Sequence, residues 1–329
     1  MSGGRARAIR RRSFIEGWSA WLAAACLARC GGATNQGEAD ATPTDRSTAP
    51  TASATARLAP TSTATPAPGP SPTRTITRAP TATATAEPRA PSVTLTIVYD
   101  NNPGPAGYTA DWGFGCVAQG DGWSVLFDTG ASGSVLLGNM RTAGIDPGSI
   151  DGVALSHIHS DHVGGLRDLL TVSTPDAVYV PSSFPRSFKD GVRAHTSVVD
   201  VDEPARVLPR KAHGLWSTGE VDGATAEQGL VIEAASGAVL LVGCAHPGIV
   251  RMVERARAVT ELDLQLVMGG FHLGGVAAGE LERVAAALRD LGVRRVAPCH
   301  CSGDAARRVF ADAFGADCVL PHVGFVVNV

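Results

Sequence analysis

Three histidines and one aspartate fall within six consecutive positions, from His157 to His162, and this stretch constrains the fold more than any other. Segment 150–155 just before it has the apolar pattern of a short buried strand, so the histidines emerge where a strand ends. Gly164 and Gly165 follow and let the backbone approach closely. Imidazole is the commonest protein ligand of zinc-like ions, and carboxylate is a good second type, so we expect a metal site here. A solvated histidine-rich loop is the alternative.

Three later histidines repeat this local design and argue against that alternative. His246, His272 and His300 each follow an apolar strand and a glycine or proline breaker. The strands are expected at 238–242, 264–267 and 293–297. A hydrogen-bonded core histidine remains the alternative for each, and it weighs most for His272.

The motif H-x-H-x-D-H followed by Gly-Gly-Leu resembles the signature of the metallo-β-lactamase superfamily, and the resemblance extends over about 93–329. Asp-Thr-Gly at 128–130 resembles the block that precedes the metal loop. Blocks 243–248, 268–273 and 298–303 resemble one branch, the 7,8-dihydropterin-6-methyl-4-(β-D-ribofuranosyl)aminobenzene-5'-phosphate synthase-like proteins. The resemblance implies an α/β fold, the αββα sandwich, with a metal site at one edge.

The same resemblance assigns two groups of ligands. The first metal position is implied to use His157, His159 and His246, and the second Asp161, His162 and His300. In most members an aspartate between the last two histidine blocks bridges the metals. This chain has Gly-Gly-Phe-His272 there, so His272 is expected either to bind metal or to face the substrate.

A site rich in histidine and poor in carboxylate favours zinc over magnesium or calcium, so one or two divalent ions, most readily zinc, are expected. Redox-active diiron relatives usually carry Glu where His159 stands, which favours hydrolysis here. A metal lowers the pKa of bound water to roughly 7. Asp161 is expected to be the catalytic carboxylate that positions this water. The expected substrate is an ester-like or phosphoester-like small molecule. The alternatives are a non-catalytic metal- or ligand-binding lipoprotein and a redox protein on the same fold.

Four further residues near these motifs have two interpretations each. Cys299 and Cys301 flank His300 and could be soft ligands, but neighbours in an extended segment point away from each other, which favours a structural role. Trp112 and Phe114 are expected either to line the pocket or to pack in the core.

Composition excludes some other functions. The chain has 329 residues, 44% of them hydrophobic, and a net charge of −3, which suits one domain of ordinary size plus extra segments. The near-neutral balance gives no electrostatic case for nucleic-acid binding. Of seven cysteines, Cys26 and Cys30 lie near the N-terminus, and the remaining odd number implies no disulfide framework.

Residues 1–32 resemble an export signal. The segment is basic, and Arg11-Arg12-Ser-Phe-Ile resembles the twin-arginine pattern. Its apolar run is too short for a normal membrane span. The sequence ending at Cys26 resembles a lipoprotein processing site, with Cys30 as the rival. A basic N-terminus with a short core helix is the alternative. We therefore expect an extracytoplasmic protein of the bacterial cell envelope, held to the membrane by an N-terminal lipid.

Residues 33–92 are dominated by Thr, Ala, Pro and Ser and hold almost no large apolar side chain. Such a segment cannot bury enough surface to offset its ordering entropy, so it is expected to be a disordered stalk. The folded domain is then 93–329.

Within that domain, strands are expected at 93–99, 112–119, 123–127, 177–180, 230–234 and 239–242, besides those already given. Helices are expected at 248–259, 281–291 and 304–314. Segment 182–227 is polar and rich in proline, and it is expected to be an irregular loop over the substrate, with His195 and His213 on its surface.

Overall fold

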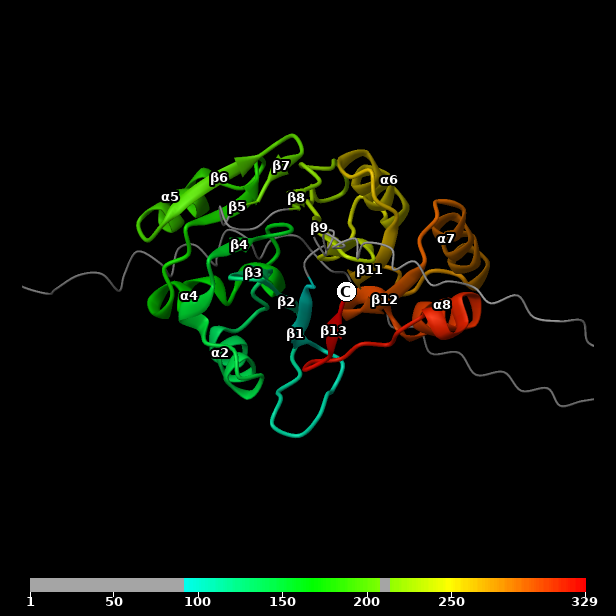
Figure 1. Cartoon of the computed structure of the whole chain (residues 1–329), viewed down its shortest axis with the longest axis horizontal. Coiled ribbons are helices and arrows are strands. Elements are labelled where there is room, and N and C mark those ends of the chain that lie inside the picture. The colour runs from blue at the N-terminus through cyan, green and yellow to red at the C-terminus, as the bar shows by residue number, and fades with distance from the viewer. Residues whose placement is uncertain (1–91, 208–213) are drawn as a thin grey trace, which may run out of the picture. The chain divides into compact units, whose positions relative to one another are not determined.

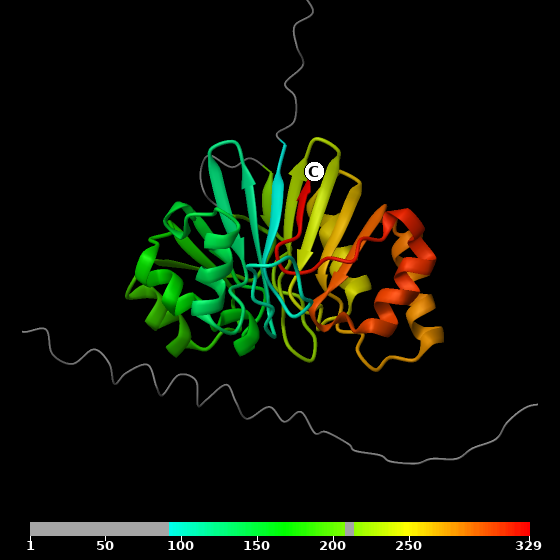
Figure 2. The ribbon, with the colours of Figure 1, turned by 90° about the horizontal axis from the view of Figure 1, so that it is seen from below.

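Two β-sheets pack face to face, and helices cover the outer face of each (Figures 1 and 2). The computed structural model describes residues 92–207 and 214–329. The export signal, Cys26, Cys30, nearly all of the stalk and His213 lie outside these ranges. Among the described residues, no helix combines the length and apolar character needed to span a bilayer. The expected αββα sandwich is confirmed.

The first sheet of the described chain has seven strands, which are antiparallel up to β3 and parallel from β3 to β6. Its order is β13 (Val326–Asn328), β1 (Thr94–Asp100), β2 (Phe114–Gly120), β3 (Trp123–Phe127), β4 (Gly152–Ala154), β5 (Ala177–Pro181) and β6 (Ser197–Val201).

The second sheet has six described strands, of which β10, β11 and β12 run parallel. Its order is β12 (Arg295–Cys299), β11 (Leu264–Gly270), β10 (Gly237–Val242), β9 (Leu230–Ala234), β8 (Leu215–Ser217) and β7 (Ala205–Arg206). The parallel strands are buried on both faces, which is why their sequences are almost continuously apolar.

The helices divide between the two outer faces, as Figure 2 shows. The first sheet is covered by α2 (Gly133–Thr142), α4 (Leu166–Val172) and α5 (Arg186–Arg193), and the second by α6 (Ile249–Val259), α7 (Ala278–Asp290) and α8 (Asp304–Phe314). Short helix α3 (Ser160–Val163) follows β4, and 3-10 turns occur at η1 (Pro147–Ser149), η2 (His300–Ser302) and η3 (Gly315–Asp317).

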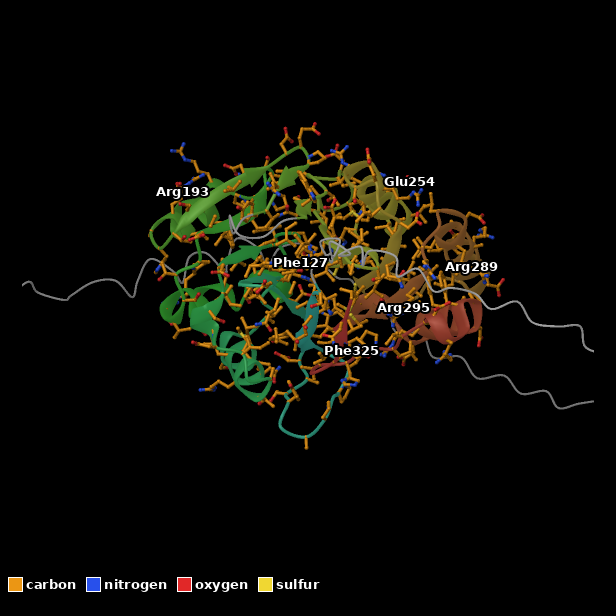
Figure 3. The ribbon with its side chains drawn as sticks, viewed as in Figure 1. Phe127, Arg193, Glu254, Arg289, Arg295 and Phe325 are labelled. Carbon is orange, nitrogen blue, oxygen red and sulfur yellow. The ribbon has the colours of Figure 1, made fainter. Side chains whose placement is uncertain are left out.

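The core between the sheets is built by alternate strand residues. Ile97 and Phe127 of the first sheet join Ile232 and Met268 of the second in one buried cluster. Burying each such side chain contributes about 1.5–3 kcal/mol. Figure 3 shows Phe127 inside the fold, whereas Arg193, Glu254 and Arg289 lie at its periphery. The sheets therefore form a rigid support for the loops at their edges.

The expectation of an irregular loop over 182–227 is wrong. This segment contains α5, β6, β7 and β8. Strand β6 ends the first sheet and β7 ends the second, and edge strands are commonly short and polar. Lys189 on α5 pairs with Asp200 on β6 and donates to the carbonyl of Ser182 at 2.7 Å. The polar composition reflects this edge position. His195 is exposed in the turn between α5 and β6.

Parallel strands place their carboxyl ends at one edge of a sheet, and ligand sites of α/β sheets lie outside those ends. In the first sheet, β3 and β4 end at Phe127 and Ala154, just before Asp128 and His157. In the second, β10, β11 and β12 lead into the loops of His246, His272 and His300. Both sheets therefore contribute side chains to a common site.

Candidate metal centre

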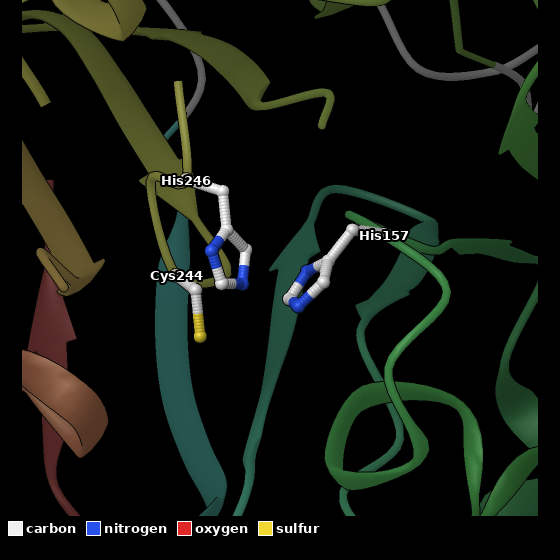
Figure 4. Close-up of side chains that lie close together, drawn as sticks. All are labelled: His157, Cys244 and His246. Carbon is white, nitrogen blue, oxygen red and sulfur yellow. The ribbon is translucent and has the colours of Figure 1, made fainter. Parts of the chain in front are cut away.

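His157, His159 and His246 form the first group of imidazoles. The ring centroids of His157 and His159 lie 4.7 Å apart, and those of His246 lie 4.7 Å from His157 and 4.8 Å from His159. His157 Nε2 lies 3.1 Å from His159 Nδ1, while the Nε2 atom of His246 is buried without a hydrogen-bond partner. Figure 4 shows His157 facing His246 and Cys244, which come from the loop after β10. Three ring nitrogens thus converge from two sheets.

Asp161, His162 and His300 form the second group. Asp161 Oδ2 lies 3.6 Å from His162 Nε2 and 3.4 Å from His300 Nε2. The side chains of both histidines are fully buried, and His300 Nε2 has no hydrogen-bond partner. The His162 ring centroid lies 4.2 Å from that of His157, so the two groups adjoin.

One buried carboxylate, that of Asp128, orients a histidine of each group. Its Oδ2 accepts from His162 Nδ1 at 2.7 Å and from the Ser156 hydroxyl at 2.7 Å. The same Ser156 oxygen lies 2.8 Å from His157 Nδ1 and, having donated its proton to Asp128, accepts from it. The Nδ1 atoms of both rings are therefore committed to these hydrogen bonds, and their Nε2 atoms are turned toward the centre, as ligands require.

Asn101 and Asp100 hold His300 in the same way. His300 Nδ1 donates to Asn101 Oδ1 at 2.9 Å, and the His300 backbone N–H donates to Asp100 Oδ2 at 3.2 Å. These contacts position His300, whose backbone φ is +47°, a conformation that residues other than glycine rarely adopt. Asp128, Ala245 and His272 also have positive φ, at +59°, +57° and +49°. Such strain gathers at functional sites because the surrounding contacts compensate for it.

Glu227 holds the loop that presents His246. Its Oε1 accepts from the backbone N–H groups of Gly243, Cys244 and Ala245 at 2.9, 3.0 and 2.9 Å, and its Oε2 accepts from that of His246 at 2.9 Å. Burial raises the pKa of Glu227 to about 7, although these hydrogen bonds act against the rise. No sequence motif pointed to Glu227 or Asn101.

The expectation that Cys301 points away from the centre is wrong, because His300 opens a 3-10 turn and not an extended segment. Ligand atoms of Cys301, His272 and Cys244 all lie within 4.8 Å of one another. Hydrogen bonds from Cys244 and His272 hold the pKa of the Cys301 thiol well below its ordinary value. Cys299 is buried and belongs to the core between the sheets. His272 is exposed, with its ring centroid 4.3 Å from that of His246.

The two aromatic candidates have different positions. Phe114 is fully buried and packs edge-on against Phe127, so it belongs to the core. Trp112 is 55% exposed, and its ring centroid lies 4.8 Å from that of His300. Trp112 therefore forms a wall beside the second group.

The pKa shifts suit cation binding. Burial lowers the pKa of His246 to about 3 and that of His157 well below its usual range, so both imidazoles are neutral near pH 7. Burial alone would raise the pKa of Asp161, but His300 and His162 hold it well below its usual range. Burial would lower the pKa of His162, yet the Asp128 carboxylate raises it to about 9. A cation binding at His162 must therefore displace a proton from its Nε2.

These donors fit divalent ions of the zinc type. The centre combines imidazole nitrogens, two thiols and one ionised carboxylate, and two buried Nε2 atoms lack hydrogen-bond partners. All six residues expected from the sequence to bind metal lie at this centre, with His272 at its exposed side.

Two known proteins are similar to this chain over most of their own length. The 7,8-dihydropterin-6-methyl-4-(beta-D-ribofuranosyl)-aminobenzene-5'-phosphate synthase of Methanocaldococcus jannaschii is 28% identical over 250 residues, which cover 62% of this chain and 84% of that protein. An uncharacterized protein of the same organism is 25% identical over 250 residues, covering 68% and 95%.

Solved structures show the same fold. A metal-dependent hydrolase of the beta-lactamase superfamily aligns with a TM-score of 0.59 and 26% identity, covering 71% of this chain and 98% of that one. The metallo-beta-lactamase fold protein YhfI from Bacillus subtilis aligns with a TM-score of 0.53 and 17% identity, covering 72% and 99%. The family model of the metallo-beta-lactamase superfamily matches residues 116–300, more than half of the sequence. This chain belongs to the metallo-beta-lactamase superfamily.

Proposed function

We propose that the protein is a metal-dependent hydrolase that acts on an ester-like or phosphoester-like small molecule. The observation that carries the proposal is the convergence of two adjoining ligand groups, with buried, unpartnered Nε2 atoms on His246 and His300. The donors suit one or two divalent ions, zinc first among them. Such an ion would supply a Lewis acid and would lower the pKa of a bound water to about 7. Similarity to a metal-dependent hydrolase at 26% identity supports this reaction class.

The residues of the chain have separate roles in this proposal. His157, His159 and His246 would hold the first ion, and Asp161, His162 and His300 the second. Asp161 lies between two imidazoles of the second group and is ionised, so it would also orient the attacking water. His272 lies at the exposed side of the centre and would face the substrate.

The substrate class is argued from Trp112 and from the archaeal relative. An exposed indole beside His300 offers a flat apolar surface to a ring or acyl group of the substrate. The relative is a synthase whose name includes a 5'-phosphate, which supports testing phosphate esters first. The substrate panel should therefore contain aryl and ribosyl phosphate esters, lactones and thioesters.

The test combines this panel with two ligand variants. We expect zinc in the purified domain and turnover of at least one ester class. His157→Ala and His246→Ala should each lose metal and lower kcat/KM by at least about 100-fold, because even residues that only orient a ligand affect activity 10- to 100-fold. His195→Ala, which changes an exposed histidine in the turn after α5, is the matched control. Full metal content and near-normal rates in either ligand variant would contradict the assignment.

The same measurements separate the two alternatives. A non-catalytic binding lipoprotein would retain metal and turn over no member of the panel. A redox protein would contain iron and react with a flavin partner.

A further inference from the structure

Cys244 lies between the two ligand groups. Its sulfur belongs to one set of mutually close ligand atoms with His157 and His246, and to a second set with His162 and His300. Within each set all ligand atoms lie within 4.8 Å of one another. The residue is only 3% exposed, so its sulfur faces these side chains and not solvent.

The distances suit metal ligation. Zn–S and Zn–N bonds of about 2.3 and 2.05 Å at a tetrahedral angle place the two ligand atoms about 3.6 Å apart. Cys244 Sγ lies 3.2 Å from His162 Nε2. The Nδ1 atom of His162 is committed to Asp128, and the fully buried Nε2 of His300 has no hydrogen-bond partner. The Nε2 atoms of His162 and His300 therefore remain available beside the sulfur.

No carboxylate near the site histidines, among the residues that the structure describes, is free to lie between the two ion positions. Asp128 accepts from Ser156 and His162, and both oxygens of Glu227 accept backbone N–H groups. Asp161 contacts the second group alone. Two divalent cations at adjoining positions repel each other, and an anion between them reduces that repulsion.

We propose that the Cys244 sulfur, as a thiolate, is a ligand shared by the two ions of the centre. This inference rests on the proposed metal centre and adds a ligand that no motif indicated. Metal binding would release the thiol proton to solvent, as it does for cysteine ligands in general. His272 and Cys301, whose ligand atoms lie within 4.8 Å of the same sulfur, complete its polar surroundings.

The experiment uses cobalt as a spectroscopic probe. The full chain is stripped with a chelator and titrated with Co²⁺, while bound metal and near-ultraviolet absorption are followed. We expect two Co²⁺ per chain, a thiolate-to-cobalt charge-transfer band and proton release. Cys244→Ser should lose the band and weaken the second binding step by at least about 10-fold. Cys318→Ser, which changes a partly buried cysteine in the loop before β13, is the matched control. It should keep the charge-transfer band and the wild-type affinity of the second binding step.

The possible outcomes distinguish this proposal from the function it rests on. Two bound Co²⁺ without the band in the wild-type chain would overturn the shared thiolate and leave the metal centre intact, whether or not the variants fold. A band that survives in Cys244→Ser and disappears in Cys301→Ser would overturn it in favour of Cys301. Absence of Co²⁺ binding altogether would overturn the metal centre itself. Circular dichroism of each variant confirms its fold.

Discussion

Asp128 shows how one residue can serve two sites. It orients His162 directly and His157 through the Ser156 hydroxyl, and it adopts a positive φ to do so. Because the two histidines belong to different groups, the orientation of one histidine in each group depends on this one carboxylate. The centre is therefore one hydrogen-bonded unit, in which a change at one residue affects both ion positions.

Asp161 should affect the second group more than the first. Asp161→Asn keeps the shape of the side chain but removes the charge that faces His162 and His300. We expect kcat to fall by roughly 10- to 100-fold or more while one ion stays bound. Metal analysis and steady-state kinetics on the same sample check this. Unchanged kcat would show that turnover does not depend on the second group.

At the residue scale, the sequence predicted the metal ligands better than it predicted the residues that hold those ligands in place. Six histidines and Asp161 could be recognised because imidazole and carboxylate side chains followed strand ends. Cys244 could not, because a small apolar-looking residue two positions before His246 also fits a buried turn. Asn101, Asp100 and Glu227 act through contacts across 199, 200 and up to 19 residues of sequence, which local patterns do not encode.

At the scale of elements, the loop after β10 depends on an acceptor supplied by another segment. Glu227 precedes β9 and accepts four backbone N–H groups of the loop that carries Cys244 and His246. The loop has no regular secondary structure to satisfy these donors. Its conformation therefore depends on one side chain.

Glu227→Gln should destabilise this loop and the protein. An amide replaces one acceptor oxygen with an NH₂ group, which leaves at least one buried N–H unpaired, at a cost of about 1–3 kcal/mol. Urea denaturation should show a lower midpoint, and the affinity for metal should fall. Glu254→Gln, on the exposed face of α6, is the matched control and should leave the midpoint unchanged. Equal midpoints for the two variants would contradict this role of Glu227.

Long apolar elements were predictable, and short edge elements were not. Helices α6, α7 and α8 and the strands β9 to β12 carry clear apolar patterns, since each buries one or both faces. Strands β6 and β7 lie at sheet edges and α5 presents a charged face, so their composition resembles that of a loop. Edge position is a tertiary property, and sequence periodicity does not report it.

At the scale of the whole molecule, we propose that the protein is exported by the twin-arginine route and anchored by lipid on Cys26. Replacing Arg11-Arg12 by Lys-Lys should retain the precursor in the cytoplasm, and Cys26→Ala should abolish lipidation. Fractionation and radiolabelled-lipid incorporation measure both, with Cys30→Ala as the matched control. Normal export of the Lys-Lys variant would indicate the ordinary secretory route, and lipidation of Cys26→Ala would favour Cys30.

The convergence of both sheets at one edge also sets an order of events during synthesis. The last residue of the first ligand group is His246, and the second group needs His300, which is made 54 residues later. At about 5–20 residues per second, that interval is roughly 3–10 s. A nascent chain therefore has the ligands of one ion position before it has those of the other. A chain that ends before β12 would lack His300 and could complete only one of the two ion positions, so ribosomal processivity bears directly on the yield of competent protein.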